Sequence, residues 1–168
     1  MSRIGDQDNL IARSINLLLQ AINENRRLSK RLSAPTLGNL RLADSVRELV
    51  EMVAATRKFE LTLDTDSIND LETSEELHLT VYRIIQEQLT NISRYAEASH
   101  AQVILDRKDQ SLTLEIKDDG KGFDPLQKRN GIGITNMIMR AENIDGELLI
   151  DSVPGRGCIL TAWFPLQS

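Results

Sequence analysis

The residues best suited to chemistry in this sequence lie in one short stretch, residues 115–124, which reads EIKDDGKGFD. Just before and within it, Leu112, Leu114 and Ile116 alternate with polar residues, which is the period of a half-buried strand. Acidic residues and glycines then replace that pattern. A carboxylate at a strand end can accept a hydrogen bond from an amino group, and glycine lets a flat ligand approach the backbone closely. The stretch is therefore the first candidate for a binding site.

A plain surface turn explains these residues equally well when they are taken alone, because Asp-Asp-Gly and Lys-Gly are ordinary turn sequences. A calcium-binding loop fits less well. No alternating run of Asp or Asn follows Gly120, and no suitably spaced Glu closes such a loop. Signals elsewhere in the chain have to decide between a turn and a site.

Two other features of the chain could complete a site. Gly131-Ile-Gly133 stands at the start of a predicted helix, where free backbone N–H groups can bind an anion. Asn91, on another predicted helix, offers an uncharged oxygen that suits a hydrated Mg²⁺ bound mainly by phosphates. Taken alone, a Gly-x-Gly sequence usually serves packing or helix capping, and an asparagine on a helix is usually solvated. Only the combination of these features with the acidic glycine stretch indicates a site.

The overall composition restricts the classes of function. The chain has 168 residues, with 20 Lys and Arg against 25 Asp and Glu, and a net charge of -5. Because it has no basic cluster and only 4% aromatic residues, a nucleic-acid-binding surface is not expected, whereas a nucleotide held by Mg²⁺ is compatible. The single cysteine, Cys158, excludes an internal disulfide and a cysteine-based zinc site.

The same features predict a cytoplasmic location. A lone cysteine fits a reducing compartment, and the sequence contains no apolar run of membrane-spanning length and no signal peptide. Whether a full-length parent protein carries a membrane anchor stays open.

The first 33 residues predict one long helix. Ile4, Ile11, Leu18 and Leu32 share a seven-residue spacing, and Asn25 lies on the same seam, where a polar residue can set the register. The helix could fold onto its own domain, but its regular spacing favours a helical bundle or a dimer arm. The sequence SAPTLGN at residues 33–39 breaks the pattern and marks a boundary between domains at 1–33 and 34–168.

The second of these domains mixes helices and strands. Two hairpins and the order of the elements predict an α/β (α+β) two-layer sandwich, in which helices cover one face of a mostly antiparallel mixed sheet. Residues 64–72 are predicted to form a polar loop, and Trp163 and Phe164 to be core residues of the last strand. The predicted helices are 42–53, Ser74 (as N-cap) to Ile92, and one from Gly131; the predicted strands are 59–63, 101–107, 112–117, 147–153 and 158–164.

Several motifs taken in order resemble a known family. They are Glu87-Gln-Leu-Thr-Asn91-Ile-Ser-Arg94-Tyr95, Asp118-Asp-Gly120-Lys-Gly122-Phe123, Asn130-Gly131-Ile-Gly133 and Pro154-Gly-Arg-Gly157. Together they look like the successive boxes of the ATP-binding domain shared by sensor histidine kinases, gyrase-type topoisomerases, HSP90 chaperones and mismatch-repair ATPases. Within that superfamily, residues 82–87 and the short loop before Asn130 resemble the histidine kinases whose response regulators carry helix-turn-helix domains. The resemblance covers residues 40–166.

This resemblance implies which residues hold the base of ATP. Asp118 would accept a hydrogen bond from the adenine amino group, and Gly120 and Gly122 would let the base lie against the backbone. Tyr95 would flank the nucleotide. Cys158 stands where the family usually has a threonine whose hydroxyl assists the aspartate, and a thiol is a weaker hydrogen-bond partner.

The resemblance also implies which residues hold the phosphates. Asn91 would bind Mg²⁺, Arg94 would offer positive charge, and Gly131 and Gly133 would let the lid and the following helix surround the phosphates. Glu87 heads its box. In the ATPase relatives the acid at that place activates water, so Glu87 is an uncertain catalytic candidate here.

The implied reaction transfers the γ-phosphoryl group of Mg-ATP to a histidine, and from there to an aspartate in the receiver domain of a response regulator, as in a two-component phosphorelay. In the resembled subfamily the accepting histidine directly precedes an acidic residue, but His78 precedes Leu79 and His100 precedes Ala101. We therefore expect a catalytic fragment that binds ATP without phosphorylating itself. Residues 1–33 resemble the second helix of a dimerisation hairpin, through which the full-length protein would form a homodimer.

Two alternatives stay open. An anti-sigma-type serine kinase has the same fold and also lacks its own histidine, although it does not need the seven-spaced helix. A degenerate domain that binds ATP weakly or not at all, and acts as an interaction module, would explain Cys158 and the missing acceptor histidine.

Overall fold

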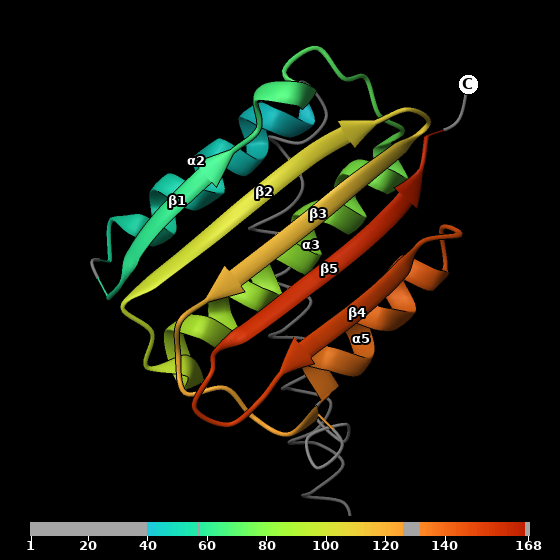
Figure 1. Cartoon of the computed structure of the whole chain (residues 1–168). Coiled ribbons are helices and arrows are strands. Elements are labelled where there is room, and N and C mark those ends of the chain that lie inside the picture. Colours follow the sequence, from blue (N-terminus) through green and yellow to red (C-terminus); the bar gives the residue numbers. More distant parts are fainter. Residues whose placement is uncertain (1–39, 57, 126–131, 167–168) are drawn as a thin grey trace, which may run out of the picture. The chain divides into compact units, whose positions relative to one another are not determined.

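The computed structural model describes residues 40–56, 58–125 and 132–166. The long helix predicted for residues 1–33 and the glycine at 131 lie outside these ranges. In the described part, one sheet is covered on one face by the helices α2 (Leu42–Ala54), α3 (Glu75–Asn91) and α5 (Ile132–Glu142), as Figure 1 shows. The predicted two-layer fold with helices on one face is confirmed.

The sheet is mixed and mostly antiparallel, as predicted. Its five strands have the spatial order β1-β2-β3-β5-β4. Only the edge pair β1–β2 is parallel, whereas β2–β3, β3–β5 and β4–β5 are antiparallel. The strands are β1 (Glu60–Asp64), β2 (His100–Lys108), β3 (Ser111–Asp118), β4 (Glu147–Ser152) and β5 (Cys158–Pro165).

The helix α3 lies behind the central strands and begins as the sequence predicts. The Ser74 side chain accepts a hydrogen bond from the Leu77 N–H at 3.2 Å, and Glu75 and Glu76 occupy the first turn, where the helix dipole favours acids. Its inner face is mostly apolar, with Val81, Ile84 and Ile85 each 0% exposed. This packing fixes the helix against the sheet and so fixes where its C-terminal end lies.

The alternation of β3 also places its side chains as predicted. Leu112, Leu114 and Ile116 are 0% exposed and face the helices. On β5, however, the prediction that both Trp163 and Phe164 are core residues is wrong for one of them. Phe164 is 1% exposed and Trp163 is 37% exposed, because consecutive residues of a strand point to opposite faces of the sheet.

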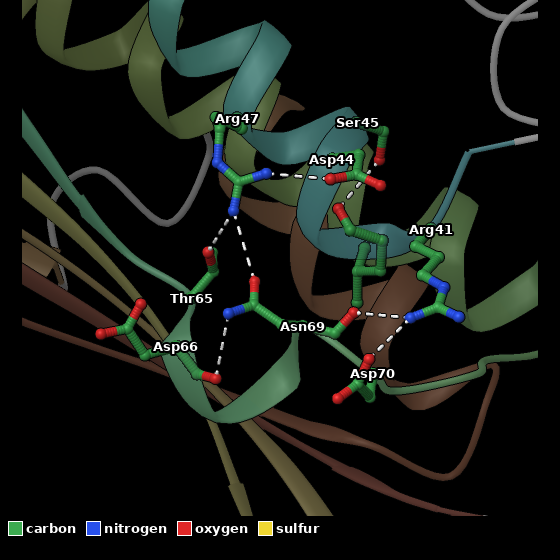
Figure 2. Close-up of polar contacts among 9 residues, drawn as sticks. Arg41, Asp44, Ser45, Arg47, Thr65, Asp66, Asn69 and Asp70 are labelled. Carbon is green, nitrogen blue, oxygen red and sulfur yellow. Dashed lines mark hydrogen bonds and ion pairs between the residues drawn. The ribbon is translucent and has the colours of Figure 1, made fainter.

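The connection between β1 and α3 is not simply a polar loop. It contains a short 3-10 helix, η1 (Asp66–Ile68), and Ile68 is 0% exposed. Figure 2 shows how α2 is joined to this connection: Arg47 donates to Thr65 and Asn69, both at 3.3 Å, and Arg41 donates to the Asn69 carbonyl oxygen at 3.2 Å. Because these arginines lie on the surface, their contacts add little to the free energy of folding, although they join the two segments.

His78 connects α2 and α3 inside the protein. Its Nε2 lies 2.6 Å from the Ser45 hydroxyl oxygen, and the His78 residue is 6% exposed. Burial lowers the pKa of His78 below its ordinary value, so the neutral ring is favoured. The described structure therefore gives this histidine a structural role between α2 and α3.

Candidate functional site

The predicted site residues that fall within the described ranges gather at one end of the sheet and its helices. The C-terminal end of α3, the end of β3 and the turn between β4 and β5 lie together at the lower end of Figure 1, beside the start of α5. The strand register brings the motifs into contact, because Asp118 pairs with Ala101 on β2 and with Cys158 on β5. Residues distant in the sequence thus meet at the end of β3.

Asp118 is held firmly at the last position of β3. Its Oδ1 accepts a hydrogen bond from the Gly120 N–H at 2.9 Å. Burial raises the pKa of this carboxyl above its ordinary value, and the hydrogen bond from Gly120 works in the opposite direction. A carboxylate has a second oxygen, which in this position can accept a hydrogen bond from a ligand amino group.

The glycines after Asp118 are required by close backbone packing. A Cβ atom on Gly120 would collide with the carbonyl oxygen of Ala96 and would lie 2.8 Å from Asp118 Oδ1. Gly122 has a φ of +59°, and a Cβ there would collide with the Val153 carbonyl oxygen. Both glycines are therefore needed for the loop to pack against the neighbouring backbone, and their contact with a flat ligand stays a prediction.

Gly157 was not among the predicted site residues, although its motif was recognised. It has a φ of +72°, and a Cβ atom there would collide with the carbonyl oxygen of Asp118. The turn before β5 thus lies directly against the end of β3. The signal that could have found it was the second glycine of the Pro-Gly-Arg-Gly sequence at 154–157.

Ser152 is a second residue that the sequence analysis missed. Its hydroxyl donates to the Gly157 carbonyl oxygen at 2.8 Å and accepts from the Phe123 N–H at 3.0 Å. One buried side chain therefore connects the end of β4, the turn before β5 and the loop after β3. A lone serine at a strand end gives no sequence signal for this role.

The helix α3 ends in an unexpected way. Asn91 is its last residue, and the chain continues as a π-helix, η2 (Ile92–Ala96), until Glu97 adopts a left-handed conformation with a φ of 54°. Single π-helical turns are frequent at functional sites. Asn91 is half-buried, whereas Arg94 and Tyr95 are exposed, with Tyr95 at 54%.

The start of α5 lies against α3 at this end. A Cβ atom on Gly133 would collide with the Oε1 atom of Glu87 and would lie 3.3 Å from its Cδ atom. The structure thus brings the catalytic candidate Glu87 to the first turn of α5. The neighbouring predicted residue, the glycine at 131, is outside the described residues.

Cys158 is a buried, neutral thiol beside Asp118. It is 4% exposed, and burial, followed by the charge of Asp118, raises its pKa to about 11. The side-chain amide of Gln88 donates to the Cys158 sulfur at 3.9 Å. Gln88 is therefore a further neighbour of the site that the sequence analysis did not select.

The arrangement suits a flat ligand that carries both an amino group and an anionic tail. A fixed carboxylate and a glycine-lined backbone lie at one end, and an asparagine and a helix start lie at the other. In residues 40–56, 58–125 and 132–166, no group of three or more His, Cys, Asp or Glu side chains could hold a metal ion. Nor is any helix in those ranges long and apolar enough to cross a membrane.

Comparison with known proteins gives a family match. Residues 76–168 match the model of the histidine kinase-, DNA gyrase B- and HSP90-like ATPase family. Among curated proteins, the chain is similar to the sensor histidine kinase LiaS of Bacillus subtilis, with 32% identity over 88% of this chain and 40% of that protein. It is also similar to the oxygen sensor histidine kinase NreB of Staphylococcus carnosus, with 30% identity over 96% of this chain and 48% of that protein.

The chain spans less than half the length of these curated relatives. Among solved structures, the histidine kinase domain of the Erythrobacter litoralis EL346 blue-light activated histidine kinase is similar, with a TM-score of 0.63 and 17% identity. That match covers 76% of this chain and 62% of the other, and at this identity it supports the fold alone.

Proposed function

Because the chain belongs to the histidine kinase-, DNA gyrase B- and HSP90-like ATPase family, we propose that residues 34–168 form the ATP-binding catalytic domain of a two-component sensor histidine kinase. The single observation that carries the proposal is the setting of Asp118. Its carboxylate is fixed at a strand end by the Gly120 N–H, in a loop whose glycines pack directly against the neighbouring backbone.

The base of ATP is proposed to bind at this carboxylate. The adenine amino group donates to Asp118, whereas the carbonyl oxygen that guanine has in that place would face the carboxylate as a second acceptor. Gly120 and Gly122 let the ring approach the backbone. Exposed Tyr95 flanks the nucleotide, and the Cys158 thiol supports Asp118 only weakly because sulfur is a poor hydrogen-bond partner.

The phosphates are proposed to bind between η2 and α5. Asn91, at the end of α3, offers one oxygen ligand to Mg²⁺, which neutralises phosphate charge when bound. Arg94 adds positive charge, and Gly131 and Gly133 allow close approach of the backbone at the helix start. Glu87 lies against Gly133 and so is placed to contact the same region.

The proposed reaction transfers the γ-phosphoryl group to a histidine and then to an aspartate of a response regulator, and it requires mainly positioning and charge neutralisation. The two histidines of the chain do not suit the acceptor role. His78 is buried against Ser45, and His100 contacts Asp119 at 2.9 Å. We propose that the acceptor lies elsewhere in a cytoplasmic homodimer, of which residues 1–33 form part of the dimerisation helices.

Calorimetric titration with a non-hydrolysable ATP analogue tests the nucleotide site. The unaltered chain should bind the ATP analogue but not a GTP analogue, and Mg²⁺ should strengthen that binding. Asp118→Asn should abolish adenine selectivity, since an amide presents a donor as well as an acceptor. Equal affinity for the two nucleotides in the unaltered chain would contradict the assignment of Asp118.

A second candidate function is a degenerate interaction module. Cys158 is the reason to consider it, because a thiol supports Asp118 only weakly. A labelled-phosphate assay separates the two functions. A helical hairpin carrying the acceptor histidine of a longer parent protein is added to the full chain with labelled ATP. Label on that histidine supports the kinase, whereas nucleotide binding without transfer supports the module.

A further inference from the structure

The loop after β3 is attached at its outer side to the start of β2 by Asp119 and His100. We propose that this pair positions the neighbouring Asp118 for base recognition, so that Asp119 and His100 are positioning residues of the nucleotide site. This inference rests on the proposed function. Neither residue was selected from the sequence, and neither belongs to the set that contacts the base.

Asp119 makes an unusually complete set of contacts for a surface acid. Its Oδ1 accepts hydrogen bonds from the N–H groups of Ser99 and His100, both at 2.8 Å. Its Oδ2 lies 2.9 Å from His100 Nδ1, and its own N–H donates to the His100 carbonyl oxygen at 3.2 Å. The side chain and the backbone of Asp119 thus both bind the same short segment.

A second attachment holds the opposite side of the loop. The Lys121 N–H donates to the Ala96 carbonyl oxygen at 2.8 Å, and the Lys121 ammonium group contacts Glu97 Oε1 at 2.5 Å. Gly120 lies between the two attachments, and it donates the hydrogen bond that fixes Asp118. Loss of the Asp119 attachment would therefore free the backbone on the C-terminal side of Asp118.

The charges around His100 favour its cationic form. Glu60 on β1 lies 3.3 Å from His100 Nε2, and Asp119 lies at its Nδ1. The hydrogen bond with Asp119 raises the pKa of His100, and contacts with His100 and Ser99 lower the pKa of Asp119 to about 2. Asp119 therefore stays ionised near neutral pH, while His100 loses its charge as the pH rises through its raised pKa.

Substitutions at these two positions separate positioning from folding. Both side chains are substantially exposed, at 65% for His100 and 47% for Asp119, so substitution does not disturb the core. Asp119→Asn keeps an oxygen for the backbone N–H groups but loses the acceptor for His100. His100→Ala removes the donor, whereas His100→Asn keeps an N–H near the Nδ1 position but cannot titrate. Glu115→Gln is the matched control, since it breaks a partly exposed ion pair within β3, which Glu115 makes with Lys117 at 2.7 Å.

The affinity for the ATP analogue is measured for the full chain and these variants from pH 6 to 9. Asp119→Asn and His100→Ala should weaken binding about three- to tenfold at pH 6, which corresponds to the loss of about one ordinary hydrogen bond, since solvent screens this exposed pair. Glu115→Gln should bind like the unaltered chain at that pH, whereas His100→Asn, which donates without a charge, should bind with an affinity between those of His100→Ala and the unaltered chain.

The pH profile shows whether His100 acts through its charge. The ratio of the His100→Ala dissociation constant to that of the unaltered chain should decline as the pH rises, and this ratio cancels the titration of the nucleotide itself. A ratio that is the same at every pH, or equal affinities of Asp119→Asn and the unaltered chain, would overturn the inference.

Hydrogen exchange distinguishes this inference from the proposed function. In Asp119→Asn, the amides of Asp119, Gly120 and Lys121 should exchange faster, with those of α2 unchanged. If the unaltered chain binds no nucleotide, the proposed function fails. If the loop amides of Asp119→Asn also exchange at the rate of the unaltered chain, the positioning role fails as well. If they exchange faster, Asp119 holds the loop in place although the chain binds no nucleotide.

Discussion

Asp118 and Cys158 are direct cross-strand neighbours, because Asp118 ends β3 and Cys158 begins β5 in an antiparallel pair. The Cys158 thiol, with its pKa raised to about 11, is protonated at neutral pH beside the carboxylate. Towards the Asp118 carboxylate it can therefore act only as a weak hydrogen-bond donor. Exchanging the sulfur at position 158 for a hydroxyl oxygen should therefore change the affinity of the site for the base.

Cys158→Thr is expected to tighten binding of the ATP analogue about two- to tenfold, which is the effect of one improved hydrogen bond. A hydroxyl donates more strongly than a thiol to a nearby carboxylate or water. Calorimetry on the full chain measures the change. Cys158→Val has the shape of threonine without the hydroxyl, so it controls for the added methyl group and should show no gain.

Gly120→Ala should disrupt the loop, because the added methyl group collides with the backbone of Ala96. Overpacking of this kind costs about 1–3 kcal/mol of unfolding free energy, and nucleotide binding should weaken in parallel. Urea denaturation and calorimetry measure the two effects. Gly155→Ala serves as comparison, since no atom lies within 4 Å of a Cβ there and only its φ of +84° is unfavourable. Unchanged nucleotide binding by Gly120→Ala would contradict this prediction, because it would show that the loop can shift to accommodate the methyl group.

Ser152→Ala removes the one side chain that joins three segments of the site. The Gly157 carbonyl oxygen loses its donor and the Phe123 N–H loses its acceptor, which should cost about 1–3 kcal/mol of unfolding free energy. Denaturation by urea measures this loss. Ser111→Ala is the control: Ser111 also donates to a backbone carbonyl oxygen, at 2.9 Å, but it does so in an exposed turn. Equal stability of the two variants would argue against a joining role for Ser152.

His78 should make stability depend on pH. Burial holds its folded-state pKa below 6.5, the value expected for the unfolded chain, so the unfolded chain binds more protons as the pH falls below about 6.5. The free energy of unfolding should therefore decrease from pH 7.5 towards pH 5, and level off once the folded protein also binds the proton. His78→Gln should flatten this dependence in urea denaturation.

His100 provides the contrast for that experiment. Its pKa is raised in the folded state, so its contribution to stability is full below pH 6.5 and is lost as the pH rises through the raised pKa. His100→Asn should therefore leave the acid-side decrease intact. A decrease that survives in His78→Gln would assign it to other groups.

Several features of the fold could be predicted because they depend on local periodicity. The alternation of Leu112, Leu114 and Ile116 requires a strand with one buried face, and Ser74 followed by acids requires a helix start. The same logic failed for Trp163, where a preference for burying aromatic residues was placed above the two-residue period of the strand. The π-helix after Asn91 could not be predicted, since it depends on how the end of α3 meets the loop after β3.

By itself, the sequence determined the set of motifs and their order, from the motif that begins at Glu87 to the glycines before Cys158. Their residue types limit the chemistry because carboxylate, amide and glycine each offer a fixed set of hydrogen-bonding atoms. Only the tertiary structure decided that Asp118 faces Cys158, that Gly133 lies against Glu87, and that Ser152 and Asp119 attach the loop on two sides. These contacts join residues far apart in the chain, so they depend on strand register and helix packing, which no local pattern encodes.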